Sequence, residues 1–160
     1  MTDEEFLNVL NQHERLLYSI CHTFCRADRE EMQDLYQDIL FGLWRSRDSY
    51  RDLCSAKNWI YRVALNTAIS LRRKKSVRPV VIPLPEEMEF WLAEEGSDGL
   101  HEELYALIDQ LSNADKALIF LYLDGASEHD MAETMGLSVS NIGTRIHRIK
   151  QKLKTLNTDK

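Results

Sequence analysis

The chain has 160 residues, a formal net charge of −6 and a hydrophobic fraction of 44%. That fraction is ordinary for a globular protein, so the composition argues against a disordered chain. The acidic start, MTDEEFLNVL, is unlike a secretory signal peptide, and no apolar run reaches the length of a membrane span. We therefore expect a cytoplasmic protein without membrane insertion.

Apolar residues at helical spacing predict helices throughout the N-terminal half. Thr2 and Glu5 have the spacing of a capping box at the start of the first helix. The apolar residues of that single helix are Phe6, Leu10, Leu17, Ile20 and Phe24. Asp28 would cap a second helix, and Ser55 would cap a third that runs through AKNWIYRVALNTAISLRRKK.

Two cysteines of the first predicted helix raise the question of a metal site. Cys21 and Cys25 lie one turn apart with His22 between them, and His13 lies upstream. Zinc usually takes four such ligands, and no second cysteine–histidine pair completes the set. The cysteines also continue the apolar side of the helix, where free cysteine is a common core residue. We therefore expect core cysteines, with no metal and no other cofactor.

The middle of the chain predicts a break between two helical domains. The prolines in RPVVIPLP end the third helix, because proline lacks the backbone donor. The proline, glutamate and glycine that follow predict a linker over residues 76–99. Helical segments resume with HEELYALIDQL, NADKALIFLYLDG, SEHDMAETMG and LSVSNIGTRIHRIKQKLKTL. The expected fold is all-α, with two small helical domains, 1–75 and 100–160, joined by an acidic linker.

Charge is segregated along the chain. Residues 61–85 contain six basic and no acidic side chains, and residues 86–115 contain ten acidic and no basic ones. Residues 137–160 contain six basic side chains against one acidic. Such asymmetry concerns partners rather than fold. Charge runs are usually solvated faces, but two basic blocks on two predicted helices favour two contacts with nucleic acid.

The segment SEHDMAETMGLSVSNIGTRIHR has the layout of a helix-turn-helix, whose second helix enters the major groove of duplex DNA. Ser127 would cap the first helix, Gly136 would supply a left-handed turn, and Ser138 would cap the second helix. At about 100° per residue, one apolar stripe forms the core side of that second helix. It consists of Ile142, Ile146, Ile149, Leu153 and Leu156.

The polar side of the same helix predicts a contact with DNA. Arginine, asparagine and threonine contact guanine, adenine and thymine, respectively. Lys150 and Lys154 point elsewhere, toward phosphate or solvent. Gly143 is unexpected, because glycine destabilises a helix interior. It is explained either by close approach of the helix to a DNA backbone or by a neutral change of sequence that the helix tolerates. The predicted contact cluster is Asn141, Thr144 and Arg148, flanked by Arg145 and Lys152.

The third predicted helix combines aromatic residues with a strongly basic end. That composition suits melted DNA, where aromatic side chains stack on bases and basic groups hold the backbone. Its two aromatic residues are Trp59 and Tyr61. The neighbouring Ile60 and Val63 favour a core position for Trp59.

DLYQDILFGLWR followed by AKNWIYRVALNTAISLRRKK resembles the promoter-melting domain of bacterial sigma factors. The last four predicted helices resemble the family's domain for the upstream promoter element, and the two-domain layout is similar to the extracytoplasmic-function (ECF) group. The resemblance covers most of the chain outside the linker. It implies a subunit that binds core RNA polymerase and promoter DNA, is not an enzyme and has no small-molecule substrate.

The resemblance also implies three groups of site residues. Contact with core polymerase is implied for Asp34, Gln37, Asp38 and Phe41. Contact with the melted promoter element is implied for Asn66, Ser70, Arg72 and Arg73, and we predict it also for Tyr61 and Arg62 of the same helix. Contact with the upstream element is implied for Asn141, Thr144, His147 and Arg148, and we predict it also for Ser140 and Arg145 of the same helix. Gly143 and His147 depart from the residues common at these positions in the family, which leaves the identity of the upstream element open. The loop SRDSYRDLCSAKN would capture a flipped base, through a residue not assigned.

Two alternatives stay open at this point. A helix-turn-helix regulator that binds duplex DNA without polymerase would explain residues 100–160, but not DLYQDILFGLW. An adaptor that binds only protein would predict that Arg148→Ala leaves function unchanged. An anti-sigma partner is common for proteins of this kind. Exposed polymerase-binding surfaces and a linker would permit one, and its existence is left open.

Overall fold

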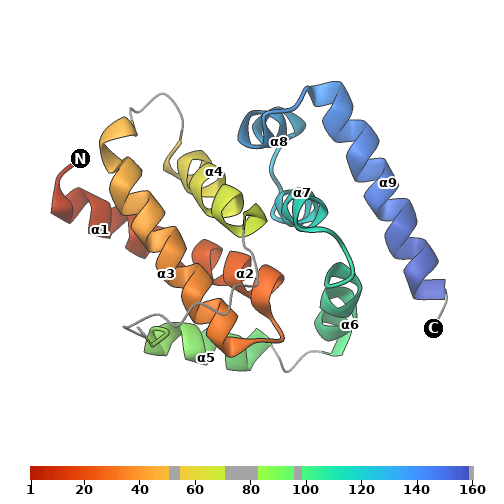
Figure 1. The fold of residues 1–160 in the computed structure, drawn as a ribbon, viewed down its shortest axis with the longest axis horizontal. Helices are drawn as coiled ribbons and strands as arrows, with labels where there is room; N and C mark the ends of the chain where they lie inside the picture. The colour runs from red at the N-terminus through yellow and green to blue at the C-terminus, as the bar shows by residue number, and fades with distance from the viewer. Residues whose placement is uncertain (51–54, 71–82, 96–98, 159–160) are drawn as a thin grey trace. The chain divides into compact units, whose positions relative to one another are not determined.

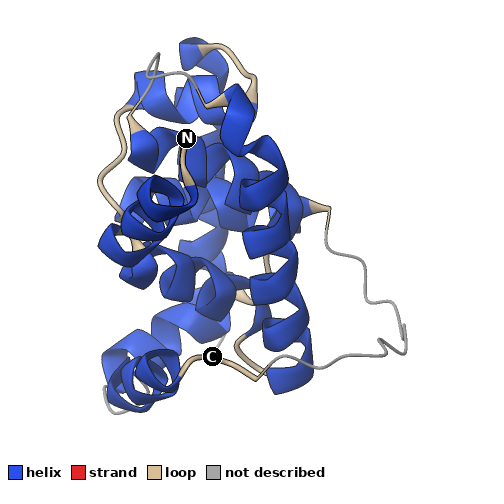
Figure 2. Ribbon diagram, turned by 90° about the vertical axis from the view of Figure 1, so that its left-hand side faces the viewer, coloured by secondary structure: helices blue, strands red, loops and turns tan. Residues whose placement is uncertain are grey.

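The computed structural model describes residues 1–50, 55–70, 83–95 and 99–158, which form helices and no strand (Figures 1 and 2). The all-α prediction is confirmed for these residues. The chain divides into two compact units, Met1–Ser97 and Asp98–Lys160, each with its own buried apolar residues.

The first unit packs three of its helices around one core. Its elements are α1 (Asp3–Gln12), α2 (Glu14–Cys25), α3 (Arg29–Ser46), a 3-10 turn (Arg47–Ser49), α4 (Ala56–Ile69) and α5 (Glu86–Glu95). Helices α2, α3 and α4 supply the fully buried residues Ile20, Leu35, Ile39, Leu43, Ile60 and Leu65. Gly42 permits close approach of α3 to α4, because a Cβ there would lie 3.2 Å from Val63 Cγ1.

Side-chain caps confirm the predicted starts of α1, α3 and α4. The Glu5 N–H donates to Thr2 Oγ1 at 3.1 Å, and the Thr2 N–H donates to Glu5 Oε2 at 2.9 Å. The side chains of Asp28 and Ser55 accept hydrogen bonds from the first turns of α3 and α4. These bonds satisfy backbone donors that have no partner within the helix.

The prediction of one continuous helix from Thr2 to Phe24 is wrong at His13, which separates α1 from α2. The His13 backbone has φ −120° and ψ 21°, outside the helical region. Its N–H donates to the Leu10 carbonyl at 3.2 Å, and its Nδ1 lies 2.9 Å from the Val9 carbonyl oxygen. The imidazole thus takes the carbonyl that the His13 N–H would bond in an unbroken helix.

The predicted linker at 76–99 needs correction, because residues 86–95 form helix α5 and belong to the first unit. Leu84, Met88 and Leu92, spaced four residues apart, are 7%, 0% and 8% exposed. The Pro85 carbonyl accepts the Met88 N–H at 3.0 Å and so opens the helix. The predicted extension of the third helix to Lys75 lies outside the described residues.

The cysteines of α2 are core residues, as predicted. Cys21 and Cys25 are 0% and 3% exposed. Burial, followed by the neighbouring Cys25 thiol, raises the pKa of Cys21 well above its ordinary value. Cys54 lies outside the described residues.

In the second unit, residues 99–158 form a bundle of four helices. They are α6 (Gly99–Ile108), α7 (Asn113–Leu123), α8 (Glu128–Met135) and α9 (Val139–Thr158). Ile108, Leu118, Leu121, Met131 and Ile142 are among its buried residues. Across both units, none of the described helices is long and apolar enough to cross a membrane.

Candidate nucleic-acid and polymerase interfaces

Helices α8 and α9 form the predicted helix-turn-helix. The Ser127 side chain caps α8 by accepting the Asp130 N–H at 3.0 Å. Gly136 ends this helix with φ 68° and ψ 32°, the left-handed conformation expected of it. Ser138 Oγ then accepts the Asn141 N–H at 3.1 Å and caps α9. Local hydrogen bonding therefore sets the turn that orients α9.

Helix α9 has one buried and one exposed side. Ile142, Ile146 and Ile149 are 0%, 6% and 3% exposed and pack into the core of the second unit, as the apolar stripe predicted. The last two residues of the predicted stripe, Leu153 and Leu156, are only partly buried. The residues predicted to contact the upstream element lie outside this stripe. Ser140, Asn141, Thr144, His147 and Arg148 are exposed, and Arg145 is partly exposed. The first turn of α9 carries no acidic residue, so no carboxylate there opposes a phosphate.

Two further residues of α9, Lys150 and Gly143, were not among the predicted DNA contacts. The Lys150 ammonium donates to Tyr122 Oη at 2.7 Å and lies 4.0 Å from the centroid of the same ring. Lys150 is therefore held against α7, in agreement with the prediction that it points elsewhere. A Cβ at Gly143 would meet no atom within 4 Å, so packing within the protein does not require glycine there.

Helix α4 presents a polar stripe in the first unit. Arg62, Asn66 and Ser70 are exposed, and their spacing of four residues places them on one side of the helix. Ser70 follows the last residue of α4, and the predicted Arg72 and Arg73 lie beyond it, outside the described residues. The described part of the predicted melted-DNA contact is thus polar, with one cationic side chain at Arg62.

Tyr61 does not lie on this stripe. Its side chain is 2% exposed, because position 61 faces the core together with Ile60 and Leu65. The prediction that this ring contacts a DNA base is therefore corrected, because the ring packs in the core. The exposed Lys57, which sequence reading missed, covers the ring, with its ammonium 5.6 Å from the ring centroid. Its position one turn before Tyr61 was the available signal.

Trp59 is a core residue, as its neighbours predicted. It is 5% exposed, and its ring lies 5.0 Å from the ring of Tyr50, centroid to centroid. Tyr50 belongs to the loop expected to capture a flipped base, and residues 51–54 of that loop lie outside the described part of the chain. The described end of the loop thus contacts α4 through two aromatic rings whose planes are tilted by 35°.

The residues predicted to contact polymerase share one side of α3. Asp34, Gln37 and Asp38 are partly exposed, and Phe41 is 58% exposed. Their spacing of three and four residues corresponds to a single helix side. This side of α3 therefore presents an exposed aromatic ring beside two carboxylates.

An apolar groove of about 630 Å³ adjoins this surface, between α1 and α3. Phe6 and Trp44 line it, with their rings edge to face and their centroids 5.2 Å apart. The guanidinium carbon of Arg45 lies 5.0 Å from the centroid of the Phe41 ring, and that of Arg47 lies 3.6 Å from the centroid of the Trp44 ring. Sequence reading missed the contribution of α1, because the break at His13 that turns α1 onto α3 was not predicted.

Comparisons with known proteins agree with this layout. Residues 9–78 match the family model of sigma-70 region 2, and residues 101–153 match that of sigma-70 region 4. The first match covers α2, α3 and α4, and the second covers the helix-turn-helix.

Curated relatives carry sigma-factor names. The ECF RNA polymerase sigma factor SigE of Mycolicibacterium smegmatis is 23% identical over 154 residues, which is 91% of this chain and 59% of the relative. RNA polymerase sigma factor SigV of Bacillus subtilis is 22% identical, over 87% of this chain and 82% of the relative. The ECF RNA polymerase sigma-E factor of Haemophilus influenzae is 26% identical, over 80% and 75%.

Two solved structures share the fold. CnrH, in complex with the cytosolic domain of CnrY, has a TM-score of 0.69 at 20% identity, over 99% of this chain and 90% of that one. The sigma factor RpoE of Bartonella quintana, in complex with the anti-sigma factor NepR, has a TM-score of 0.67 at 23% identity, over 97% and 95%. With both sigma-70 regions present in order along one chain, the protein belongs to the sigma-70 family of RNA polymerase sigma factors and has the layout of its ECF group.

Proposed function

We propose that this sigma factor binds core RNA polymerase, reads the upstream promoter element with α9 and holds melted DNA with α4. The proposed polymerase contact is the α1–α3 surface, which consists of the exposed side of α3 around Phe41 and the adjoining groove between α1 and α3. The observation that supports this proposal most is the chemical difference between three surfaces of one chain. Exposed polar and basic side chains occupy α9 and α4, whereas α3 carries carboxylates beside an exposed aromatic ring. Two surfaces thus suit nucleic acid and one suits protein.

The α3 surface is unsuited to DNA, because Asp34 and Asp38 would repel phosphates. The exposed Phe41 ring and the neighbouring groove offer apolar area that a protein partner can bury. Carboxylates around such an apolar centre would select a basic partner surface and orient it. Core polymerase is the partner that a sigma factor requires.

The exposed side of α9 carries the proposed readout of duplex DNA. Arg148 can pair with the O6 and N7 of guanine, and Asn141 with the N6 and N7 of adenine. Thr144 offers its methyl group to thymine, although its hydroxyl already donates to the Ser140 carbonyl at 3.2 Å. Ser140, Arg145 and His147 lie where they can contact phosphates or base edges and so set the register.

The exposed stripe of α4 carries the proposed contact with melted DNA. Asn66 and Ser70 can donate to and accept from the polar edges of unpaired bases, and Arg62 can hold the phosphate backbone. Arg72 and Arg73 would extend this contact beyond the described end of α4. Unpairing is unfavourable, and binding the opened strand offsets its cost, with base stacking worth about 1–3 kcal/mol per base.

The proposed role is recognition rather than catalysis. It places the protein in the cytoplasm, where core polymerase and the chromosome are found. The complexes of CnrH and of Bartonella quintana RpoE with their partner proteins support an inhibitory partner for this chain as well. Such a partner would compete with core polymerase for the surface around Phe41.

The experiment that tests the proposal is run-off transcription with purified protein and core polymerase on fragmented DNA from the source organism. We expect discrete transcripts that need both components, with start sites that reveal the promoter. Phe41→Asp should abolish these transcripts and reduce binding to core polymerase at least about 30-fold, as expected for an interfacial aromatic hot spot worth about 2 kcal/mol.

Phe90→Asp provides the matched control. Phe90 is 69% exposed on α5, outside the α1–α3 surface, and the substitution introduces the same charge. Equal loss for both variants would contradict a specific role for Phe41. Binding to duplex DNA without any polymerase-dependent transcript, with a cognate polymerase present, would instead support the helix-turn-helix regulator.

A further inference from the structure

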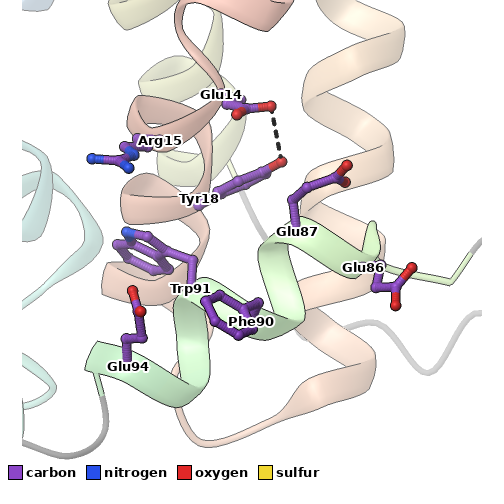
Figure 3. Close-up of a pocket in the computed structure, with 8 residues that line it drawn as sticks. All are labelled: Glu14, Arg15, Tyr18, Glu86, Glu87, Phe90, Trp91 and Glu94. Atoms are coloured by element: carbon purple, nitrogen blue, oxygen red, sulfur yellow. Dashed lines mark hydrogen bonds between the residues drawn. The ribbon is translucent and has the colours of Figure 1, made fainter.

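The packing of α5 on α2 leaves a hollow beside the contact, within the first unit (Figure 3). Met88 and Leu92 hold α5 in place and are 0% and 8% exposed. The Trp91 ring adds contacts with two rings of α2, 6.2 Å from Tyr18 and 5.7 Å from His22, centroid to centroid. The hollow has a volume of about 490 Å³ and shares none of its described residues with the groove between α1 and α3. This α2–α5 hollow is therefore a separate feature of the first unit.

Aromatic rings give the α2–α5 hollow an apolar part. Phe90 and Trp91 of α5 line it together with Tyr18 of α2. The Phe90 side chain is 69% exposed and that of Trp91 is partly exposed, so another molecule can contact both rings. Rings in such a position bind apolar side chains, and their faces also attract cations.

Carboxylates give the same hollow a negative charge. The acidic residues that line it are Glu14 of α2 and Glu86, Glu87 and Glu94 of α5. Arg15 is the only cationic side chain among the described lining residues. Tyr18 Oη donates to Glu14 Oε2 at 3.5 Å. Burial, followed by the carboxylates of Glu14 and Glu87, raises the pKa of Tyr18 to about 12, in agreement with a negative potential there.

The arrangement of these carboxylates decides which kind of ligand fits. Among the residues that the structure describes, no three histidine, cysteine or acidic side chains form a group that could hold a metal ion. Glu87 and Glu94 are two helical turns apart, which is about 10 Å along the axis of α5. Nucleic acid is excluded, because the carboxylates would repel its phosphates. The hollow therefore suits a ligand with several separate organic cations and with apolar groups between them.

A basic segment of a protein has this chemistry. Arginine is well suited, because its planar guanidinium pairs with a carboxylate through two hydrogen bonds and also stacks on aromatic rings. Lysine brings the same charge on a long apolar stem. An apolar residue between two such cations would lie against the rings of Phe90 and Trp91.

We propose that the α2–α5 hollow is a docking site for a partner protein, which binds there through a segment that combines arginine or lysine with apolar residues. Complementary charge attracts and orients the segment, and the aromatic rings offer apolar area that the segment buries. None of the described residues that line the hollow belongs to the proposed polymerase or DNA contacts. The inference therefore goes beyond the proposed function and does not depend on it.

The first test selects a binding segment without assuming its sequence. Random peptides displayed on phage are selected on the whole chain, after removal of those that also bind the double variant Glu87→Gln/Glu94→Gln. Both glutamates are exposed, so the double variant should keep its fold, which circular dichroism verifies. We expect the remaining peptides to combine basic with apolar residues. Selection that leaves no peptide, or peptides without enrichment in basic residues, would overturn the proposal.

The second test measures the affinity of one selected peptide by fluorescence anisotropy at a fixed salt concentration. The double variant should bind it at least about tenfold more weakly than the wild-type chain, because two charge-assisted contacts are lost. Glu4→Gln/Glu30→Gln is the matched control, since it removes two exposed carboxylates that do not line the hollow. The control should leave the affinity nearly unchanged. Equal weakening in both double variants would show attraction by net charge alone and would overturn the proposal.

Changes in the peptide provide the complementary test. Citrulline in place of its arginines, or acetyl-lysine in place of its lysines, removes the charge and keeps most of the shape. Binding should be lost, because the carboxylates of the hollow then have no cation to pair with. Undiminished binding of the neutral peptide would contradict the proposed role of charge.

Two other occupants of the hollow are distinguished by further measurements. Sedimentation of the protein alone tests for a second copy of the chain, which would appear as a dimer that Glu87→Gln/Glu94→Gln does not form. Titration with spermidine tests for a free polyamine, which would bind more tightly than the selected peptide. Either result would overturn a partner protein as the occupant. A monomer that binds the peptide more tightly than spermidine supports it.

Discussion

Helices α9 and α4 are both proposed to contact DNA, but their residues were predicted with unequal success. All six residues predicted on α9 are exposed or partly exposed, whereas Tyr61 of α4 is buried. The isoleucines of α9 define its core side and leave polar residues for the other side. In α4, aromatic residues can serve either core packing or base stacking, and sequence spacing alone did not separate the two roles for Tyr61.

The strongest test of this difference is Tyr61→Ala. Because the ring is buried between α4 and the core, we expect a loss of about 3–5 kcal/mol in the free energy of unfolding. Urea denaturation followed by tryptophan fluorescence measures this loss, and Tyr61→Phe should retain most of the stability. A stable Tyr61→Ala protein that fails to melt promoters would show that the ring acts on DNA directly.

On α9, Arg148→Ala should weaken binding to the upstream element without affecting stability. Loss of one bidentate contact to guanine corresponds to about 1–3 kcal/mol. Lys150→Ala is the matched control, since Lys150 is held by Tyr122. Binding of the holoenzyme to promoter variants, measured at one fixed salt concentration, distinguishes the effect of Arg148→Ala from that of Lys150→Ala. A footprint unchanged by Arg148→Ala would remove that residue from the proposed readout.

Asn66→Ala tests the exposed stripe of α4 independently of Tyr61. We expect a reduction in promoter opening of about 1 kcal/mol, roughly fivefold, because one hydrogen bond to an unpaired base is lost. Permanganate reactivity of thymines in the opened region measures the effect. Binding to the upstream element should stay the same in that experiment, and a parallel loss there would point to a general folding defect.

The smallest expected effect is that of Gly143→Ala. Alanine should stabilise α9 by up to about 1 kcal/mol, because the added Cβ meets no atom within 4 Å. Thermal unfolding measures the gain. Holoenzyme binding to the upstream element provides the second measurement. A loss of affinity despite greater stability would place Gly143 against the DNA backbone, and unchanged affinity would favour tolerated drift.

Features that depend on neighbouring residues were predicted well from the sequence. The caps formed by Thr2, Asp28, Ser55 and Ser138 each need only a side chain and the next turn of backbone. The left-handed Gly136 and the isoleucine stripe of α9 are equally local. These features define the helix-turn-helix, which is why the exposed side of α9 could be anticipated residue by residue.

Features that the spacing of apolar residues does not mark were missed. The helix break at His13 involves a local contact between its imidazole and the Val9 carbonyl, four residues earlier, but the helical spacing of apolar residues continues across it. Helix α5 lies in a proline- and glutamate-rich segment, and its burial depends on α2. The groove beside Phe41 needs both the break and the contact of α1 with α3. For α5 and for the groove, the deciding contacts join residues far apart in the sequence.

The buried cysteines of α2 have a practical consequence for labelling. Cys21 and Cys25 are inaccessible, and the raised pKa of Cys21 keeps its thiol protonated, so neither should react with maleimides while the protein is folded. The chain contains only one other cysteine, Cys54. Any thiol reactivity of the native protein would therefore report on the loop before α4, and would allow a fluorophore to be attached there without removing a natural residue.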